Sequence, residues 1–325
     1  MLMAAGLGTR MLPFTQFLAK PILPLMGVPI AQFALDQLAD AGVKKVVANI
    51  HHQAQATGAF LRSLDLHGME LILSDESKML LGGAGGIKKA LEFLGDKPFY
   101  LMNADVISDV RLQQLGRFHE TANERWGATI TFALHPGVPH QDQYSEFCLD
   151  RDQGRITSLG RKATHRPFWT GTAVIDPAAL LNVPPSGPAD FVTTILEPAI
   201  QSGTAAGIFA PSDWYDIGSP HLWWHAHLDL INKLETGKLP LLWRRRIENA
   251  ATRLAEGVWT THFFKSSMRS SEWDSPCFLG HIKNTDRKSP RFLGPSAVYY
   301  GEAIQDIAFK SGIGYSGAWV DFKKS

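Results

Sequence analysis

A glycine-rich segment near the start of the chain, followed by two cations, has the composition of a phosphate-binding loop. It reads Gly6-Leu7-Gly8-Thr9-Arg10, and Lys20-Pro21 begins ten positions after Arg10. Glycines that follow a strand expose backbone N–H groups, and these can surround phosphate oxygens. Arg10 adds a planar guanidinium that matches phosphate, and Lys20 adds a mobile ammonium. The alternative is a tight turn in which glycine only permits positive φ, but the two cations favour phosphate binding.

This segment differs from the two most familiar phosphate loops. A Walker loop requires Gly-Lys-Ser/Thr after its glycines, and no such run follows Gly8. A dinucleotide fingerprint requires a third glycine, which is also missing. The segment therefore predicts a phosphate site of another class.

Two aspartates at the ends of predicted strands are the candidate ligands of a metal ion. Asp105 follows Asn103-Ala104, and Asp216 lies in the run Trp214-Tyr215-Asp216-Ile217-Gly218. Proteins hold Mg²⁺ through one or two carboxylates together with phosphate oxygens, and the strand ends of an open α/β sheet border one crevice. Each aspartate alone is compatible with an ordinary surface or capping residue. The two aspartates are therefore candidates only, and their assignment as ligands of Mg²⁺ is implied by the family resemblance described below.

The elements that must position these residues alternate between strands and helices over residues 1–135. Apolar residues three or four positions apart indicate the helices, and short apolar runs indicate the strands. The expected strands are 1–5, 46–50, 70–73, 98–102 and 128–134, and the expected helices are 29–41, 53–64, 87–94 and 111–123. This alternation predicts parallel βαβ units in a doubly wound, mostly parallel α/β sheet.

Beyond residue 135 the pattern favours antiparallel strands and two further helices. Residues 150–154 form a turn-rich segment between two short apolar runs, which predicts a hairpin. The expected strands are 146–149, 155–159 and 169–176, and the expected helices are 191–201 and 221–234.

The last 83 residues, from Trp243 onward, have a different pattern. A helix is expected over residues 247–255. Short apolar pieces separated by glycine follow it, such as Phe278-Leu279-Gly280 and Gly312-Ile313-Gly314. Their spacing of roughly six residues predicts a β-rich tail of a degenerate hexapeptide β-helix type. An irregular β tail is the alternative.

The charge also changes between the two parts of the chain. Residues 243–325 contain 13 Lys and Arg and 8 Asp and Glu, a net charge of +5, whereas residues 1–242 carry a net −4. The change falls near Leu239 and the basic run Arg244-Arg245-Arg246. We therefore predict a catalytic domain over residues 1–239 and a tail over residues 240–325 with a packing or assembly role. Three arginines on a helix are typical of a solvated face, so they do not indicate nucleic-acid binding.

Composition and charge exclude several classes of protein. The chain has 325 residues, 45% of them hydrophobic, which suffices for one large or two modest folded domains. Two cysteines, Cys148 and Cys277, cannot form a disulfide framework or an all-cysteine zinc site and fit a reducing compartment. A formal net charge of +1 gives no argument for a nucleic-acid or membrane partner. The opening segment lacks the basic region of a secretory signal, and no apolar run approaches the ~18 residues of a membrane span. We expect a cytoplasmic protein.

The motifs above resemble those of the sugar-1-phosphate nucleotidyltransferases, also called NDP-sugar pyrophosphorylases. That family carries Gly-x-Gly-Thr-Arg-x-x-Pro followed by Lys-Pro, as residues 6–13 and 20–21 do. The run Leu81-Gly82-Gly83-Ala84-Gly85-Gly86 resembles its second nucleotide loop, and Gly171 resembles its sugar-facing glycine. The resemblance covers about residues 1–235, and it is closest to short bacterial enzymes that act on N-acetylmuramate 1-phosphate or mannose 1-phosphate. It implies a Rossmann-like sheet of the nucleotidyltransferase type.

The resemblance also implies a reaction and a set of residue roles. An NTP and a sugar 1-phosphate would give an NDP-sugar and pyrophosphate in a Mg²⁺-dependent reaction. The implied catalytic residues are Arg10, Lys20, Asp105 and Asp216, of which the two aspartates hold the metal. The implied nucleotide-binding residues are Ala5, Gly6, Gly8, Thr9, Arg10, Glu76, Gly82 and Gly83. The implied substrate-binding residues are Asn103, Glu146, Lys162 and Gly171, and for Glu146 and Lys162 a solvated hairpin charge is an equal alternative.

Two departures from the family pattern leave other functions open. Gly83 stands where the family usually has Thr, which removes one hydroxyl contact to the nucleotide, and the short first strand suggests a native start upstream of Met1. One rival function is an inactive homologue that binds a sugar nucleotide and regulates a partner. Another is a transferase with a non-sugar acceptor such as phosphocholine. Retention of both cations and both aspartates favours an active enzyme, assembled into an oligomer through its tail.

Histidines form two further motifs. His221 and His225 have the i,i+4 spacing that can bind zinc. Packing of their rings against Trp223 or Trp224 is the favoured interpretation. His51-His52 follows a predicted strand, and we expect it to be structural or to border the nucleotide.

Overall fold

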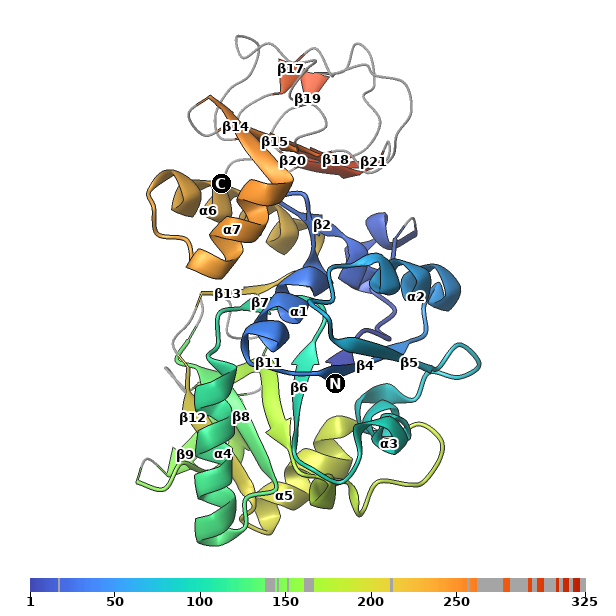
Figure 1. Cartoon of the computed structure of the whole chain (residues 1–325), viewed down its shortest axis with the longest axis vertical. Coiled ribbons are helices and arrows are strands. Elements are labelled where there is room, and N and C mark those ends of the chain that lie inside the picture. The colour runs from blue at the N-terminus through green and yellow to red at the C-terminus, as the bar shows by residue number, and fades with distance from the viewer. Residues whose placement is uncertain are drawn as a thin grey trace. The chain divides into compact units, whose positions relative to one another are not determined.

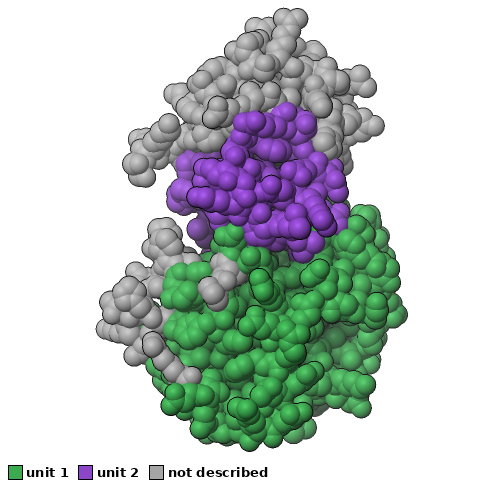
Figure 2. Space-filling model, turned by 60° about the vertical axis from the view of Figure 1, so that its left-hand side comes forward, with its two compact units in different colours: residues 1–7, 34–214 green, residues 8–33, 215–325 purple. Residues whose placement is uncertain are grey.

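The computed structural model describes most of the chain in two compact units. Unit 1 comprises residues 1–7 and 34–214, and unit 2 comprises residues 8–33 and 215–325 (Figure 2). The structure describes all residues except 17, 138–143, 145, 151, 161–166, 211–212, 256–257, 262–276, 281–291, 294–296, 301–307, 310–311, 316–317 and 322–325. The two units are described separately below.

Unit 1 contains a nine-stranded sheet that carries most of the predicted α/β pattern (Figure 1). The strands, in sheet order, are β5 (Glu70–Asp75), β4 (Lys45–Ile50), β1 (Leu2–Met3), β6 (Phe99–Asn103), β11 (Phe168–Ile175), β8 (Ile130–His135), β12 (Ala205–Phe209), β10 (Arg155–Gly160) and β9 (Glu146–Asp150). The first four are parallel, as the βαβ pattern predicts. Antiparallel pairing enters with β11, which lies between β6 and β8, and the predicted hairpin of β9 and β10 is confirmed. The sheet is therefore parallel in one half and mixed in the other.

The helices of unit 1 pack on this sheet through apolar side chains. They are α2 (Ala54–Ser63), α3 (Gly82–Leu94), α4 (Leu112–Trp126) and α5 (Glu197–Gln201), which continues a π-helical turn over Val192–Leu196. Helices α2 and α3 contact β4 and β5, whereas α4 contacts β8, β11 and β12 (Figure 1). The core is formed by large buried side chains such as Val47, Ile87, Leu101, Phe132 and Phe147. Burial of these side chains supplies most of the driving force for folding this unit.

Helix α3 begins five residues earlier than the sequence predicts, within the glycine run. A Cβ at Gly82 would lie 2.8 Å from the Ala189 carbonyl oxygen, and one at Gly85 would lie 2.7 Å from the Gly187 carbonyl oxygen. The N–H groups of Ala84 and Gly85 donate to the Ala189 carbonyl oxygen at 3.1 and 3.3 Å. The first turn of α3 is thus held against the backbone of residues 187–189, and this contact requires glycine.

Unit 2 has a small core built around two tryptophans. It contains short 3-10 helices over Thr9–Met11, Phe14–Gln16 and Lys20–Ile22, the strands β2 (Pro24–Leu25) and β3 (Val28–Pro29), and the helices α6 (Pro220–Glu235) and α7 (Leu241–Ala250). Trp223 and Trp243 are buried and make edge-to-face contacts with Phe14 and Phe33, with ring centroids 5.2 and 6.1 Å apart. Helix α1 (Ile30–Asp40) matches its prediction to within one residue at each end. The short strands β7 (Val106–Ser108) and β13 (Trp214–Asp216) were not among the expected strands; β7 begins directly after Asp105, and β13 ends at Asp216.

The tail is rich in short strands, as predicted, but its first helix is misplaced in the prediction. The helix ends at Ala250, and the residues that follow form β14 (Ala251–Ala255) rather than its continuation to 255. The further strands are β15 (Val258–Thr261), β16 (Cys277–Gly280), β17 (Phe292–Leu293), β18 (Ala297–Tyr300), β19 (Ala308–Phe309), β20 (Gly312–Tyr315) and β21 (Ala318–Asp321). Strands β15, β16, β18 and β20 pair in parallel within one six-stranded sheet. The β-rich tail is confirmed, and its hexapeptide β-helix type stays a prediction.

Candidate active site

Unit 2 brings together two of the predicted catalytic residues. Lys20 Nζ lies 3.8 Å from Asp216 Oδ1, and the two side chains are only 7% and 9% exposed. Lys20 begins the 3-10 helix Lys20–Ile22, whose turn is closed by a bond from Leu23 N–H to the Lys20 carbonyl oxygen. Asp216 is the last residue of β13. Two charges buried from water are stable only when opposite charges or polar groups accompany them, and here each charge accompanies the other.

The glycine of the Asp216 motif makes room for the carboxylate. A Cβ at Gly218 would lie 2.7 Å from Asp216 Oδ2 and 3.1 Å from Asp216 Oδ1. Ser219 then caps α6, since its hydroxyl accepts a hydrogen bond from Leu222 N–H. The run Asp216–Ser219 thus serves both to seat a carboxylate and to begin a helix.

The first glycine segment divides between the two units after residue 7. In unit 1, Ala5 is buried and Gly6 is exposed, and a Cβ at Gly6 would have no heavy atom within 4 Å. In unit 2, Gly8 has a φ of 65°, and its carbonyl oxygen accepts hydrogen bonds from Met11 N–H and the Thr15 hydroxyl at 2.9 Å each. Thr9 and Arg10 are exposed in the 3-10 helix that follows. Gly8 is therefore required by the fold, whereas Gly6 is not.

A buried hydrogen-bond chain in unit 1 holds the backbone at both predicted nucleotide loops. Ala4 N–H donates to Asn49 Oδ1 at 2.8 Å, Asn49 Nδ2 donates to Glu76 Oε1 at 2.7 Å, and Leu81 N–H donates to Glu76 Oε2 at 3.0 Å. Asn49 and Glu76 are 1% and 2% exposed. The chain joins the residue after β1 to the residue before α3, so these two side chains fix Ala4 and Leu81 relative to each other within unit 1.

This hydrogen-bond chain gives Glu76 a structural part that its predicted role did not include. Both of its carboxylate oxygens bind within the protein, and its carbonyl oxygen bonds His51 Nδ1 at 2.7 Å. His51 is therefore structural, one of the two roles predicted for it. Contact of Glu76 with a nucleotide stays a prediction. Asn49 was missed, because a lone polar residue inside the apolar run of β4 carries no motif.

Gly83, the departure from the family pattern, is explained by a neighbouring ring. A Cβ at residue 83 would lie 2.9 Å from the Cβ of Phe191. Phe191 in turn stacks on Trp169, with ring centroids 5.4 Å apart and planes 13° apart. A side chain at position 83 would have to displace this stacked pair, so Gly83 and Phe191 form a matched combination.

The predicted sugar-side residues lie mostly along β6, β9 and β11. Gly171 has a φ of 85°, and a Cβ there would lie 3.2 Å from Asn103 Nδ2, so these two residues are neighbours. Glu146 is buried in β9, opposite Phe168 of β11, and Asp105 is half-buried just beyond β6. Lys162 lies outside the described residues. Among the residues that the structure describes, no group of three or more His, Cys, Asp or Glu side chains could hold a metal ion.

The remaining sequence motifs have structural explanations. His221 and His225 are exposed on α6 with their Nε2 atoms 3.0 Å apart, and their rings pack near Trp224, with centroids 6.0 and 4.7 Å from it. This agrees with the predicted packing. Of the three arginines on α7, Arg245 is exposed, as expected of a solvated face, whereas Arg244 and Arg246 are half-buried. Within the part of the chain that is described, no helix is long and apolar enough to cross a membrane.

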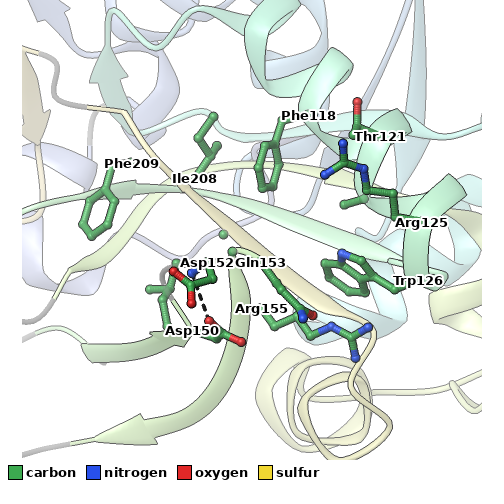
Figure 3. A pocket seen from close by; sticks show the side chains of 14 residues that line it. Phe118, Thr121, Arg125, Trp126, Asp150, Asp152, Gln153, Arg155, Ile208 and Phe209 are labelled. Carbon is green, nitrogen blue, oxygen red and sulfur yellow. Dashed lines mark hydrogen bonds between the residues drawn. The ribbon is translucent and has the colours of Figure 1, made fainter.

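Two hollows of ligand size lie in unit 1. One, of about 560 Å³, borders the second glycine segment, where Glu76, Leu81, Gly85 and Lys88 line it. The other, of about 910 Å³, lies between α4, the β9–β10 turn and β12, and it contains none of the predicted site residues (Figure 3). In it the Arg155 guanidinium lies 4.3 Å from the centroid of the Trp126 ring, a cation–π contact. The first hollow is thus adjacent to the predicted nucleotide site, and the second is separate from its residues.

Sequence comparison identifies similar proteins over most of the chain. A model of the family described as nucleotidyl transferase matches residues 1–233. The UTP–glucose-1-phosphate uridylyltransferase of Synechocystis sp. is 23% identical, over 94% of this chain and 81% of the relative. The N-acetylmuramate α-1-phosphate uridylyltransferase of Caulobacter vibrioides is 38% identical over 33% of this chain and 45% of the relative. The mannose-1-phosphate guanylyltransferase catalytic subunit beta of Danio rerio is 26% identical over 68% and 61%, respectively.

Solved structures share the fold. HddC from Yersinia pseudotuberculosis, complexed with GMP-PN, superposes with a TM-score of 0.59 at 19% identity, covering 70% of this chain and 97% of that one. The inositol-1-phosphate CTP transferase of T. maritima gives a TM-score of 0.55 at 18% identity, covering 68% and 89%. These likenesses confirm the α/β core predicted from the sequence.

Proposed function

Because the chain belongs to the nucleotidyl transferase family, we propose that it joins an NTP and a sugar 1-phosphate to give an NDP-sugar and pyrophosphate. All three similar proteins named above are described as transferring a uridylyl or guanylyl group to a sugar 1-phosphate. The observation that carries the proposal is the buried pair of Lys20 and Asp216. Both residues belong to the motifs that resemble the family, and a lysine beside an aspartate offers the two residue types that the reaction requires.

The reaction needs charge neutralisation more than proton transfer. A phosphate oxygen of the sugar 1-phosphate attacks the α-phosphorus of the NTP. As that bond forms, the bond from the α-phosphorus to the bridging oxygen breaks, and its electron pair leaves with pyrophosphate. The attacking oxygen is already an anion at neutral pH, so no general base is needed. Bringing two polyanions together is the main obstacle, and fixed cations aimed at the reacting phosphates lower it.

The two cations have different positions in this scheme. Lys20 is buried beside Asp216, which suits an ammonium that contacts the transferred α-phosphate or the sugar phosphate. Arg10 is exposed in the loop, which suits a guanidinium that holds the β- and γ-phosphates and then the leaving pyrophosphate. Gly6 supports the same assignment, because the open space at its Cα position admits a phosphate close to the backbone.

A Mg²⁺ ion fits the donor set that the chain offers. Carboxylate oxygens are ligands that Mg²⁺ prefers, and Mg²⁺ commonly binds through one or two carboxylates with phosphate oxygens completing its shell. The described residues contain no cluster of three or more metal-binding side chains, so a complete protein cage is absent among them. Asp105 and Asp216 are the residues that would hold the ion. When bound, it neutralises charge on the α-phosphate.

The tail completes the proposal. We assign catalysis to the first 239 residues and assembly to the tail, whose parallel strands pair at offsets of 15 to 20 residues, from Trp259 to Phe278, Val298 and Ile313. Such pairing supports a β-helical coil. The fragment that tests this assignment keeps α7, because Trp243 of this helix packs against Phe33 and its removal would expose that ring. A fragment of residues 1–250 should keep turnover and lose its oligomeric state in light scattering; an unchanged state would contradict the assembly role.

The same proposal assigns the enzyme to the cytoplasm, where NTPs are supplied.

The test of the function is a pyrophosphate-release assay. The full chain is incubated with Mg²⁺, each of the common NTPs and a panel of sugar 1-phosphates, with phosphocholine as the non-sugar acceptor. Release that needs both an NTP and a sugar 1-phosphate is expected. Pyrophosphate release with phosphocholine as the only productive acceptor would show that the acceptor is not a sugar 1-phosphate. Binding of an NDP-sugar without any pyrophosphate release would identify an inactive homologue.

A further inference from the structure

Two side chains on one face of α6 form hydrogen bonds to the segment that follows Lys20. Trp223 and His227 lie one helical turn apart, and both are 0% exposed. Trp223 Nε1–H donates to the Pro24 carbonyl oxygen at 2.8 Å, and Met26 N–H donates to His227 Nε2 at 3.2 Å. All of these residues belong to unit 2. The β2–β3 turn is thus bonded to α6 at two successive points.

The hydrogen bonds fix the state of the histidine. A backbone N–H can only donate, so Nε2 must be the acceptor and the ring proton must be on Nδ1. Nδ1 lies 2.9 Å from the Trp223 carbonyl oxygen, to which it donates. Burial lowers the pKa of His227 to about 3, so the ring stays neutral at physiological pH. Both ring nitrogens are therefore committed, one to α6 itself and one to the turn.

The β2–β3 turn has a backbone conformation that must be stabilised by neighbouring contacts. Met26 has a φ of 52° and Gly27 a φ of 80°. A non-glycine residue rarely adopts positive φ, and it does so where surrounding contacts hold it. The bond from Met26 N–H to His227 is such a contact. It is made at the one residue of the turn where the backbone conformation is unfavourable.

The two hydrogen bonds to Trp223 and His227 connect the segment of Lys20 to the helix that follows Asp216. Lys20 lies just before the turn, and backbone bonds from Leu23 N–H to the Lys20 carbonyl oxygen and from Ile30 N–H to the Leu23 carbonyl oxygen tie it to the base of β2 and β3. Asp216 lies four residues before Pro220, where α6 begins. Both members of the buried pair are thus attached to structure that Trp223 and His227 join.

We propose that Trp223 and His227 are positioning residues that hold Lys20 opposite Asp216 and thereby set the rate of the transfer step. This inference rests on the proposed function. It also assigns a role to a buried histidine of α6 that the sequence analysis did not single out. Misplacing a reacting or charge-stabilising group by about 1 Å can cost on the order of 10²-fold in rate. We therefore expect that loss of the hydrogen bond between Met26 and His227 lowers kcat and leaves KM nearly unchanged.

Three variants separate positioning from stability. His227→Leu removes the acceptor of Met26 N–H, and His227→Gln returns an acceptor oxygen at a similar reach. His225→Leu is the matched control, because it makes the same change at an exposed position of the same helix. Expected results are a kcat about 10- to 100-fold lower for His227→Leu with KM changed less than about threefold. Gln should recover most of this loss, and the control should behave as wild type.

A double-mutant cycle with Lys20→Ala tests whether the effect acts through Lys20. If His227 works by placing Lys20, His227→Leu should cost little further kcat once Lys20 is gone, because the two changes then remove the same contribution. Additive losses in the cycle would overturn the proposal. So would a His227→Leu variant with wild-type kcat.

A measurement that needs no activity distinguishes this inference from the function it rests on. Lys20 is 6% exposed, so acylation of its amine, followed by peptide mass spectrometry, should be slow in the wild type. We expect it to be several-fold faster in His227→Leu and unchanged in His225→Leu. Absence of pyrophosphate release from the wild type would refute the proposed function alone. Unchanged labelling of Lys20 in His227→Leu would refute the proposal that His227 positions Lys20.

Discussion

Lys20 Nζ and Asp216 Oδ1 lie 3.8 Å apart, with more than nine-tenths of each side chain shielded from water. The distance is within the range of an ion pair but longer than a hydrogen bond. Burial strengthens the interaction of this pair with any further charge that enters the site, because the surrounding dielectric is low. This is the electrostatic basis on which we propose that the pair receives a phosphate or a metal ion.

The first prediction concerns this pair. Asp216→Asn should lower kcat on the order of 10³-fold, because it removes the charge that would hold the metal ion. Lys20→Ala should lower kcat more than it raises KM for either substrate, since Lys20 acts on the phosphate that is transferred. Lys238→Ala is the control, a change of an exposed lysine in the same unit. Steady-state kinetics measure all three, and a normal kcat/KM in Lys20→Ala would remove Lys20 from the site.

The second prediction compares two glycines of the first loop. Gly6→Ala should change the free energy of unfolding by less than about 0.5 kcal/mol, since a Cβ there meets open space. It should nevertheless raise KM for the NTP about 10-fold or more, because the methyl group would occupy the space of a phosphate. Gly8→Ala should instead destabilise the fold by about 1 kcal/mol or more, since its φ is 65° and a Cβ would lie 2.8 Å from Thr15 Cγ2. Wild-type kinetics in Gly6→Ala would contradict the phosphate assignment.

The third prediction concerns the buried chain through Asn49 and Glu76. Asn49→Ala leaves the Ala4 N–H and one Glu76 oxygen without their present partner, so unfolding in urea should need about 1–3 kcal/mol less free energy. Asn232→Ala, at an exposed position of α6, should change it by less than about 0.5 kcal/mol. Equal stabilities for the two variants would show that this chain contributes little.

The fourth prediction is a pH dependence of stability. The pKa of His227 falls from 6.5 to about 3 on folding, because burial disfavours the charged ring. Between these two pH values the unfolded chain binds a proton at His227 that the folded chain does not. The contribution of neutral His227 to the free energy of unfolding is therefore complete above pH 6.5. It is lost as the pH falls, by up to about 1.4 kcal/mol per pH unit. His119, whose pKa burial also lowers, adds to the slope.

His227→Gln provides the measurement, since Gln does not titrate. Free energies of unfolding are compared for the wild type and this variant at pH 7.5, 6 and 5. The wild type should lose its advantage as the pH falls, and the curve of the variant should be flatter. Two parallel curves would mean that His227 is not the titrating group.

The sequence was sufficient for elements whose pattern is local. Helix α1 is predicted to within one residue at each end, because its apolar side chains recur with helical spacing and Gly42 stops it. The start of α3 was missed, because glycines have low helix propensity and the contact with residues 187–189 that stabilises its first turn is tertiary. The helix expected over 247–255 was wrong in its second half, where the chain forms β14 instead.

The candidate site shows the same limit. Motifs identified Lys20 and Asp216, and the structure brings them together. No sequence pattern indicated Asn49, because its role depends on which strand ends meet. The part played by His227 was also hidden, because a histidine on a helix face indicates packing or metal binding until its hydrogen-bond partners are known.

The central claim is that a sugar-phosphate oxygen attacks the α-phosphorus of an NTP, and oxygen labelling tests it most directly. A sugar 1-phosphate carrying ¹⁸O in its phosphate is incubated with the full chain, Mg²⁺ and the preferred NTP, and the products are analysed by mass spectrometry and ³¹P NMR. We predict that the NDP-sugar retains all of the label, with one labelled oxygen bridging its two phosphorus atoms, and that pyrophosphate contains none. Label in pyrophosphate, or NTP consumption without a labelled NDP-sugar, would contradict the account.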